Sequence, residues 1–141
     1  MSTPTLRHGI DLVHVPRLKE AVTDNPALEA GVFTEGERAY CRHRADPWPH
    51  FAARFAAKEA VLKALGRGLS TTGPDRALQE IEVVRGEGPP SIALFGGVRR
   101  LAARLGLGEP ALSLSHAGDY ALASVIWAED VRADGTRGGH E

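Results

Sequence analysis

One segment in the middle of the chain, residues 54–66 (RFAAKEAVLKALG), constrains the fold more than any other. The residues on one face of this segment are Phe55, Glu59, Leu62 and Gly66. Their spacing of three and four residues predicts an amphipathic helix, and glycine is the residue type that most often follows a last helical turn. Glu59 therefore falls on the stripe that should face the core, where a carboxylate needs a compensating partner.

Two interpretations of Glu59 follow from this placement. Lys63 lies four residues later, and a Glu–Lys pair at this spacing is most often a surface ion pair that contributes about 0.3–0.5 kcal/mol. In the second interpretation the helix belongs to an active site, where Glu59 holds a metal ion and Lys63 faces a phosphate. The apolar neighbours of Glu59 favour the second interpretation, because an ion pair on a packed face loses its hydration unless a ligand compensates.

Asp11 supplies a second carboxylate near the N-terminus. Residues 9–15 are rich in apolar and β-branched side chains with a period of two, which predicts a strand that enters the core. Taken alone, Asp11 is better explained as a strand-edge aspartate that caps a neighbouring backbone amide. However, a hard cation such as Mg²⁺ uses carboxylates from separate elements when substrate phosphates supply its other ligands. Together, Asp11 and Glu59 indicate phosphate chemistry.

The remaining pattern predicts an α+β fold in a single domain. Helices are expected over residues 16–23, 25–31, 34–43, 47–66 and 98–105, and strands over residues 81–83, 92–94, 112–116 and 120–127. Thr34-Glu-Gly-Glu37 matches a capping box, and residues 86–90 fit the turn of a hairpin. The lack of a steady strand–helix–strand rhythm argues against a doubly wound sheet. We expect one domain over residues 1–128 and a charged, glycine-rich, disordered tail over residues 129–141.

Composition excludes several protein classes. The chain has 141 residues and a formal net charge of −1, which argues against a surface built throughout to bind nucleic acid. No apolar run approaches the roughly 18 residues of a membrane helix, and the N-terminus lacks a secretory pattern. We therefore expect a cytoplasmic protein without a membrane partner. The only cysteine, Cys41, allows no internal disulfide and is expected to be a buried, unreactive thiol.

Further candidate site residues surround the predicted helix. His116 ends a strand at a glycine-containing turn, where a side chain can point into a cleft, although a lone histidine is more often structural. Gly66 and Gly68 would let a ligand approach the backbone closely, while a helix C-cap explains Gly66 alone better. The cations of this region are Arg54, Lys58, Lys63 and Arg67. Such a cluster suits a ligand with several phosphates, and a solvated helix face is the competing explanation.

Three motifs occur along the chain in a fixed order. They are Gly9-Ile-Asp11, then Arg54-Phe-Ala-Ala-Lys-Glu59 continuing through Lys63 and Gly66, then Ser113-Leu-Ser-His116. This order resembles the holo-acyl-carrier-protein synthase family, in the 4'-phosphopantetheinyl transferase superfamily, from about Arg7 to Ala128. The strand at residues 81–83, the turn at residues 88–90 and Tyr120-Ala121 are also similar to the family's pattern. The resemblance implies the family's fold, a mainly antiparallel sheet packed against a long central helix.

The resemblance also implies an activity. Members of the family transfer the 4'-phosphopantetheine arm of coenzyme A to a serine of an apo acyl carrier protein, with Mg²⁺ as the usual cofactor, and release adenosine 3',5'-bisphosphate. The expected setting is fatty acid or polyketide biosynthesis. Attack on a pyrophosphate diester needs charge neutralisation in the transition state, which a metal ion and a lysine supply in a partly dry site.

Site residues are carried over at matching positions. Asp11 and Glu59 become Mg²⁺ ligands, with the coenzyme A pyrophosphate and waters completing the shell. Lys63 becomes the group that stabilises or protonates the departing phosphate, and Arg54 and His116 contact the coenzyme's phosphates or orient the site. The base that takes the serine proton stays open between a metal-bound water and Glu59. The implied catalytic residues are Glu59, Lys63 and His116, and the implied coenzyme contacts are Arg54, Lys63, Gly66, Gly68, Pro90 and His116.

The resemblance further implies two kinds of protein partner. Small members of the family form homotrimers whose active sites lie between neighbouring subunits, and this chain has the length of the small form. Acidic carrier proteins dock on basic residues of the family's first helix, to which Arg17 belongs. In this chain Arg17 and Lys19 are followed by three acidic residues, Glu20, Asp24 and Glu29. Arg38, Arg42 and Arg44 on the next helix would compensate, and the identity of the carrier stays open.

Two other functions fit the sequence less well. A coenzyme A-dependent acetyltransferase would need an Arg/Gln-x-x-Gly-x-Gly/Ala loop that opens a helix, and no stretch of the chain matches it. A non-enzymatic module that binds coenzyme A or a carrier protein would have lost a metal carboxylate or Lys63. This chain keeps Asp11, Glu59 and Lys63, which favours the enzyme.

Overall fold

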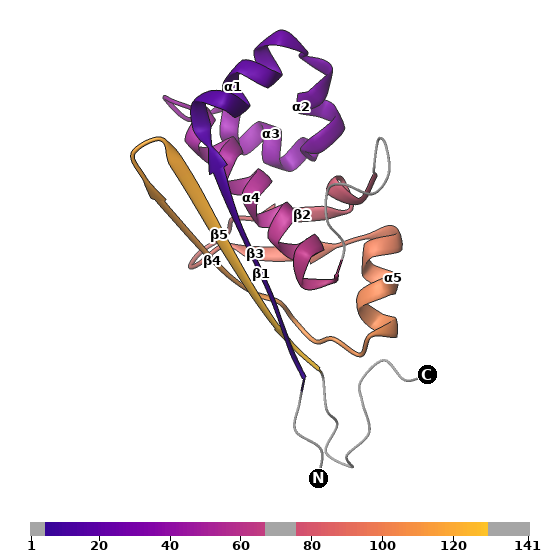
Figure 1. Cartoon of the computed structure of the whole chain (residues 1–141). Coiled ribbons are helices and arrows are strands. Elements are labelled where there is room, and N and C mark those ends of the chain that lie inside the picture. The colour runs from indigo at the N-terminus through magenta and orange to yellow at the C-terminus, as the bar shows by residue number, and fades with distance from the viewer. Residues whose placement is uncertain (1–4, 67–75, 130–141) are drawn as a thin grey trace.

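Figure 1 shows the computed structural model, which describes residues 5–66 and 76–129. A long helix, α4 (Trp48–Ala64), lies against a sheet of long strands, with the helices that precede it in the chain gathered at one end and α5 (Gly96–Arg104) at the other. The elements in chain order are β1 (Leu6–His14), α1 (Val15–Asp24), α2 (Ala27–Val32), α3 (Glu35–Arg42), α4 (Trp48–Ala64), a short 3-10 helix (Arg76–Leu78), β2 (Ile81–Val84), β3 (Ser91–Leu94), α5 (Gly96–Arg104), β4 (Ala111–Ala117) and β5 (Tyr120–Ala128). Each helix and strand expected from the sequence is present, and β1 begins three residues earlier than predicted.

The main sheet is antiparallel, with the strand order β1-β5-β4, and β2 and β3 form a separate hairpin. The inward face of β5 is fully buried beneath α4 through Ala121, Ala123, Val125 and Trp127. On the opposite face, Leu6, Ile10, Leu12 and Ile126 are exposed. One face of the sheet therefore builds the core, and the other presents apolar side chains on the surface.

Gly9 sets how closely β1 approaches α4. A Cβ atom at residue 9 would lie 1.8 Å from the backbone oxygen of Ala60, a distance that no side chain tolerates. Small side chains on α4, Ala60 and Ala64 among them, complete this close approach. Because side chains of a strand alternate between faces, Asp11 lies on the same face of β1 as Gly9 and is brought to α4 with it.

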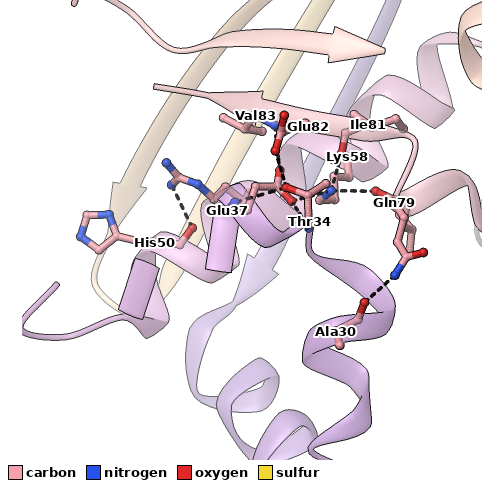
Figure 2. Close-up of polar contacts among 11 residues, drawn as sticks. Ala30, Thr34, Glu37, His50, Lys58, Gln79, Ile81, Glu82 and Val83 are labelled. Carbon is pink, nitrogen blue, oxygen red and sulfur yellow. Dashed lines mark hydrogen bonds and ion pairs between the residues drawn. The ribbon is translucent and has the colours of Figure 1, made fainter. Parts of the chain in front are cut away.

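A buried ion pair fixes α4 to its neighbours, as Figure 2 shows. Lys58 is 0% exposed, and its Nζ lies 2.7 Å from Glu37 Oε1 of α3. The same Nζ donates to the backbone oxygens of Leu78, at 2.7 Å, and Ile81. Glu37 also accepts from Val83 N through Oε2 at 2.7 Å. Burial lowers the pKa of Lys58, and the Glu37 carboxylate opposes this shift.

The prediction that Lys58 belongs to a cationic cluster for phosphates is therefore wrong. Its charge is already matched by a carboxylate and two carbonyl oxygens inside the protein. The sequence could not indicate this pairing, because Glu37 lies on a different helix and the two carbonyls belong to residues 20 and 23 positions downstream.

The ends of two helices follow their predicted signals. At α3, Thr34 Oγ1 accepts from Glu37 N and Glu37 Oε1 accepts from Thr34 N, which completes the expected capping box. At α4, Gly66 has φ of +79° and its N–H donates to Lys63 O, so the predicted glycine stop is present. Gly68 and Arg67 lie outside the described residues.

Cys41 is fully buried with Phe33 and Phe51, as expected. Burial raises the pKa of the Cys41 thiol to about 11, which keeps it protonated and unreactive. The tail predicted from residue 129 lies almost entirely outside the described part of the chain. Glu129, its one described residue, forms an isolated antiparallel bridge with Leu107.

Candidate active site

Lys63 joins α4 to β1. Its Nζ donates to Asp11 Oδ1 at 2.9 Å and to the backbone oxygen of Ile10 at 2.9 Å. The Lys63 side chain remains 46% exposed, and Asp11 is 15% exposed. An ammonium group held this way at the surface can exchange its carboxylate partner for an incoming anion at small cost.

Glu59 lies one helical turn before Lys63, about 6 Å along the axis of α4. Its side chain is buried, with 1% exposure of the residue, as the sequence pattern predicted. The neighbouring residue Ala60 is the one against which Gly9 packs. The carboxylate of Glu59 and that of Asp11 thus belong to the two elements that meet at this contact.

The carboxylates of this region suit a hard cation whose coordination shell is completed by oxygens of a bound ligand. Asp11 and Glu59 offer carboxylate oxygens, which are the donors that Mg²⁺ prefers. Within residues 5–66 and 76–129, no group of three or more His, Cys, Asp or Glu side chains could hold a metal ion by itself. A cation bound here by two carboxylates would need oxygens from water or substrate, in line with Mg²⁺ bound to phosphates.

A second group of predicted residues meets in a pocket of about 440 Å³. Arg54 of α4, Pro90 of the β2–β3 turn and His116 of β4 all line it. Three further residues line it that were not among the predicted site residues: Tyr40, His50 and Arg85. They belong to three separate segments, so no local motif could have found them together.

Arg54 is buried, at 4% exposure, although it lines this pocket. Its guanidinium carbon lies 4.1 Å from the centre of the Tyr40 ring, and Nη1 donates to the His50 backbone oxygen at 3.4 Å. Arg54 Nε has no hydrogen-bond partner among the residues that the structure describes. A buried guanidinium with an unused donor is well suited to bind an anion.

His50 stands in a positive environment within the same pocket. Burial lowers its pKa first, and the charges of Arg54, Arg44 and His116 lower it further. Arg44 also lies over the Tyr40 ring, with its guanidinium carbon 4.3 Å from the ring centre. The pocket therefore concentrates positive charge where a phosphate could neutralise it.

Arg54 and Lys63 lie on opposite sides of α4. Nine residues separate them, which is about two and a half helical turns. The structure thus divides the predicted site into two groups. We name Asp11, Glu59 and Lys63 the carboxylate side, and Arg54, Pro90 and His116, with Tyr40, His50 and Arg85, the arginine side.

A larger pocket of about 690 Å³ opens beside Asp11. It is mostly apolar, with walls from β1, α1, α2 and α4, and Phe55 of α4 lies within it. His14, Arg17 and Tyr120 also line it. Arg17, the predicted docking residue, is exposed on the first helix next to this pocket.

The arginines of α3 expected to strengthen the docking patch are largely neutralised. Arg38 Nε donates to Glu29 Oε2 at 3.1 Å, and Arg42 also forms an ion pair with Glu29. These contacts, led by the hydrogen bond from Arg42, lower the pKa of Glu29. The expectation that Arg38 and Arg42 compensate for acidic residues is therefore weakened, because Glu29 of α2 folds against them.

Within the described part of the chain, every helix is too short or too polar to cross a bilayer. Most of the chain is similar to known proteins. A model of the 4'-phosphopantetheinyl transferase superfamily matches residues 7–125. Holo-[acyl-carrier-protein] synthase of Moorella thermoacetica is 45% identical over 122 residues, which are 86% of this chain and 92% of that protein.

Solved structures agree with these relatives. The ACPS–CoA complex of Chronobacterium ammoniagenes is similar with a TM-score of 0.77 and 32% identity, over 89% of this chain and 98% of that chain. The acyl carrier protein synthase of Mycobacterium tuberculosis has a TM-score of 0.64 and 34% identity, over 86% of this chain and 95% of that chain. The predicted α+β fold, an antiparallel sheet packed on a long helix, is confirmed.

Proposed function

Since this chain belongs to the 4'-phosphopantetheinyl transferase superfamily and is a phosphopantetheinyl transferase, we propose that it modifies an apo acyl carrier protein. The reaction moves the 4'-phosphopantetheine group of coenzyme A to a carrier serine and releases adenosine 3',5'-bisphosphate. The observation that carries this proposal is the contact of Lys63 with Asp11, one turn from buried Glu59. This contact brings Asp11 to Lys63 within one helical turn of Glu59, and these are the three residues whose chemistry the proposed transfer needs.

Asp11 and Glu59 would hold Mg²⁺ in this proposal. Their oxygen donors fit that ion, and the coenzyme's pyrophosphate would complete its shell. The bound ion supplies charge neutralisation and Lewis-acid polarisation of the phosphoryl oxygens. With Asp11 bound to such a cation, the Lys63 ammonium would be available to the substrate.

Lys63 acts on the leaving group. The bond between the phosphoryl phosphorus and the bridging oxygen breaks, so negative charge develops on the departing phosphate of adenosine 3',5'-bisphosphate. The Lys63 ammonium, held by Ile10 O, donates a hydrogen bond to that oxygen or gives it a proton. The attacking serine loses its proton during the transfer, and Glu59 is a candidate acceptor for it.

The arginine side would bind the coenzyme away from the reacting bond. Arg54, with an unused buried donor, and His116 would contact phosphates, while Pro90 would border the nucleotide. Gly66 would also border the ligand in this proposal, and Gly68, a further predicted contact, lies outside the described residues. His116, carried over as a catalytic residue, would orient the coenzyme from this pocket.

A homotrimer would explain why the two sides are separated by the width of α4. Apolar side chains on the outward face of the sheet, Leu6, Ile10, Leu12 and Ile126, support an interface between copies. In such an assembly the carboxylate side of one subunit would meet the arginine side of the next. Sedimentation equilibrium tests this: a monomer at the concentration that gives full activity would contradict it.

The carrier substrate is an acidic protein of fatty acid or polyketide biosynthesis, and Arg17 would contact it. Modification would take place in the cytoplasm, a location that stays a prediction. The decisive experiment incubates the purified protein with coenzyme A, Mg²⁺ and each of several apo carriers. Mass spectrometry should detect a gain of one phosphopantetheine, and a chelator should prevent it. No gain on any carrier would refute the proposed function.

A further inference from the structure

The start of α1 is held at three points that the sequence did not reveal. β1 ends at His14, and Val15 N donates to the backbone oxygen of Asp119 at 2.8 Å. Arg17 N donates to His14 Nδ1 at 3.3 Å. The His14 ring in turn lies against Tyr120, with ring centres 5.1 Å apart and planes tilted by 60°.

His14 is the N-cap of this helix. Its backbone is extended (φ −80°, ψ 111°), and its imidazole nitrogen accepts the hydrogen bond that Ser, Thr, Asp or Asn accepts in most helices. Pro16 has no N–H, and the first turn of α1 contains no acidic residue. The imidazole is thus the side-chain acceptor that this first turn uses.

This cap acts on the residue expected to meet the carrier. The hydrogen bond runs to the backbone of Arg17 itself, and His14, Arg17, Tyr120 and Asp11 line the same pocket. Since the first turn of α1 fixes where the Arg17 side chain begins, a frayed turn would misplace the guanidinium relative to Asp11. In the proposed complex, a docked carrier has to contact Arg17 with its acidic surface while its serine lies at Asp11.

We propose that His14 is a positioning residue for carrier docking, which acts by capping α1 and so fixing Arg17 beside the reaction centre. This inference rests on the proposed function, because it assumes an acidic carrier at Arg17. It assigns His14 no contact with the coenzyme and no proton transfer.

Two variants separate the cap from the ring contact. His14→Phe keeps a ring against Tyr120 and removes the acceptor, whereas His14→Asn keeps an acceptor and removes the ring. For His14→Phe we expect the carrier KM to rise about 5-fold, with kcat and the coenzyme A KM within about 2-fold of wild type. His14→Asn should restore the carrier KM to within about 2-fold of wild type.

A matched control weakens the cap of a distant helix. Glu80 accepts hydrogen bonds from Gly97 N and Val98 N at the start of α5, so Glu80→Gln weakens that cap and leaves α1 unchanged. Its carrier KM should stay at the wild-type value. Sedimentation of each variant checks that the assembly is the same.

The outcomes are distinct. An unchanged carrier KM in His14→Phe overturns the inference, and so does an equal defect in His14→Asn, which would point to the ring instead of the cap. A parallel change of kcat and both KM values would indicate a general structural role and also overturn it. If the wild type modifies no carrier, the proposed function fails, and hydrogen exchange at Arg17 N then tests the cap by itself. Faster exchange in His14→Phe, but not in His14→Asn, supports the cap. Equal exchange in the wild type, His14→Phe and His14→Asn refutes it.

Discussion

The two sides of helix α4 use positive charge in opposite ways. On the carboxylate side, Lys63 is half-exposed and rests on Asp11 at the surface of the sheet. On the arginine side, Arg54 is buried against Tyr40, with a donor that no described residue uses. A half-exposed cation beside carboxylates suits a reaction in which charge develops on a leaving group, and a buried, oriented guanidinium suits recognition of a fixed phosphate. One helix thus separates chemistry from binding.

The largest expected effect comes from Lys58, which fixes the helix between the two sides. Lys58→Met would leave the Glu37 carboxylate buried without its counter-charge, so the free energy of unfolding should fall by about 3–5 kcal/mol. Urea denaturation measures this. Adding Glu37→Gln should restore part of the lost stability. In Lys58→Met, turnover by the carboxylate side and coenzyme binding by the arginine side should both be weakened. A fully stable Lys58→Met protein would contradict the role of the pair.

Glu59→Gln tests the carboxylate side. The variant keeps the size of the side chain and removes its charge, so kcat should fall by about 10²–10³-fold, or about 3–4 kcal/mol, through loss of transition-state stabilisation. The KM for coenzyme A should change much less. Steady-state kinetics of carrier modification measures both constants, with thermal unfolding as the control for folding. Activity that survives the change would refute the assigned role of Glu59.

Arg54→Gln tests the arginine side. Loss of a charge-assisted hydrogen bond should raise the KM for coenzyme A by about 10- to 100-fold, equivalent to about 1.5–3 kcal/mol. At saturating coenzyme A, kcat should be affected far less than in Glu59→Gln. A fall in kcat without a change in KM would place Arg54 with the chemistry and break the comparison between the two sides.

The smallest expected effect concerns protons at His50. Burial and three cationic neighbours lower the pKa of His50, and a phosphate bound in the pocket would offset those cations and raise it. Coenzyme binding should then take up protons, so affinity should increase as the pH falls through the range in which His50 titrates, by less than about 10-fold. An NMR titration of His50 with and without coenzyme A measures the shift. No upward shift would argue against a phosphate at this position.

Local features of the sequence predicted the local structure well. The period of Phe55, Glu59 and Leu62 identified α4 and the inward placement of Glu59, and Gly66 marked its end. The capping box at Thr34 was equally clear. These signals act within a few residues of the backbone they control, so they do not depend on the rest of the fold.

Features that depend on contacts across the fold could not be predicted in this way. The Gly9–Ala60 contact joins a strand to a helix about 50 residues later in the chain. The contact requires a residue without a side chain at position 9, and nothing in the neighbouring sequence indicates this requirement. The arginine-side pocket draws His50, Arg85 and His116 from three segments. The role of His14 as a helix cap has no local signature either, because it depends on where β1 ends.

The sequence by itself determined the order of elements, the helix that carries the site and the family to which the chain belongs. Only the tertiary structure decided which charged groups are available to a ligand. Lys58, Arg38 and Arg42 are matched by Glu37 and Glu29, while Lys63 and Arg54 face opposite sides of α4. The physical reason is that helix and strand formation depends on near neighbours, whereas the desolvation and pairing of a charge depend on whatever the fold packs against it.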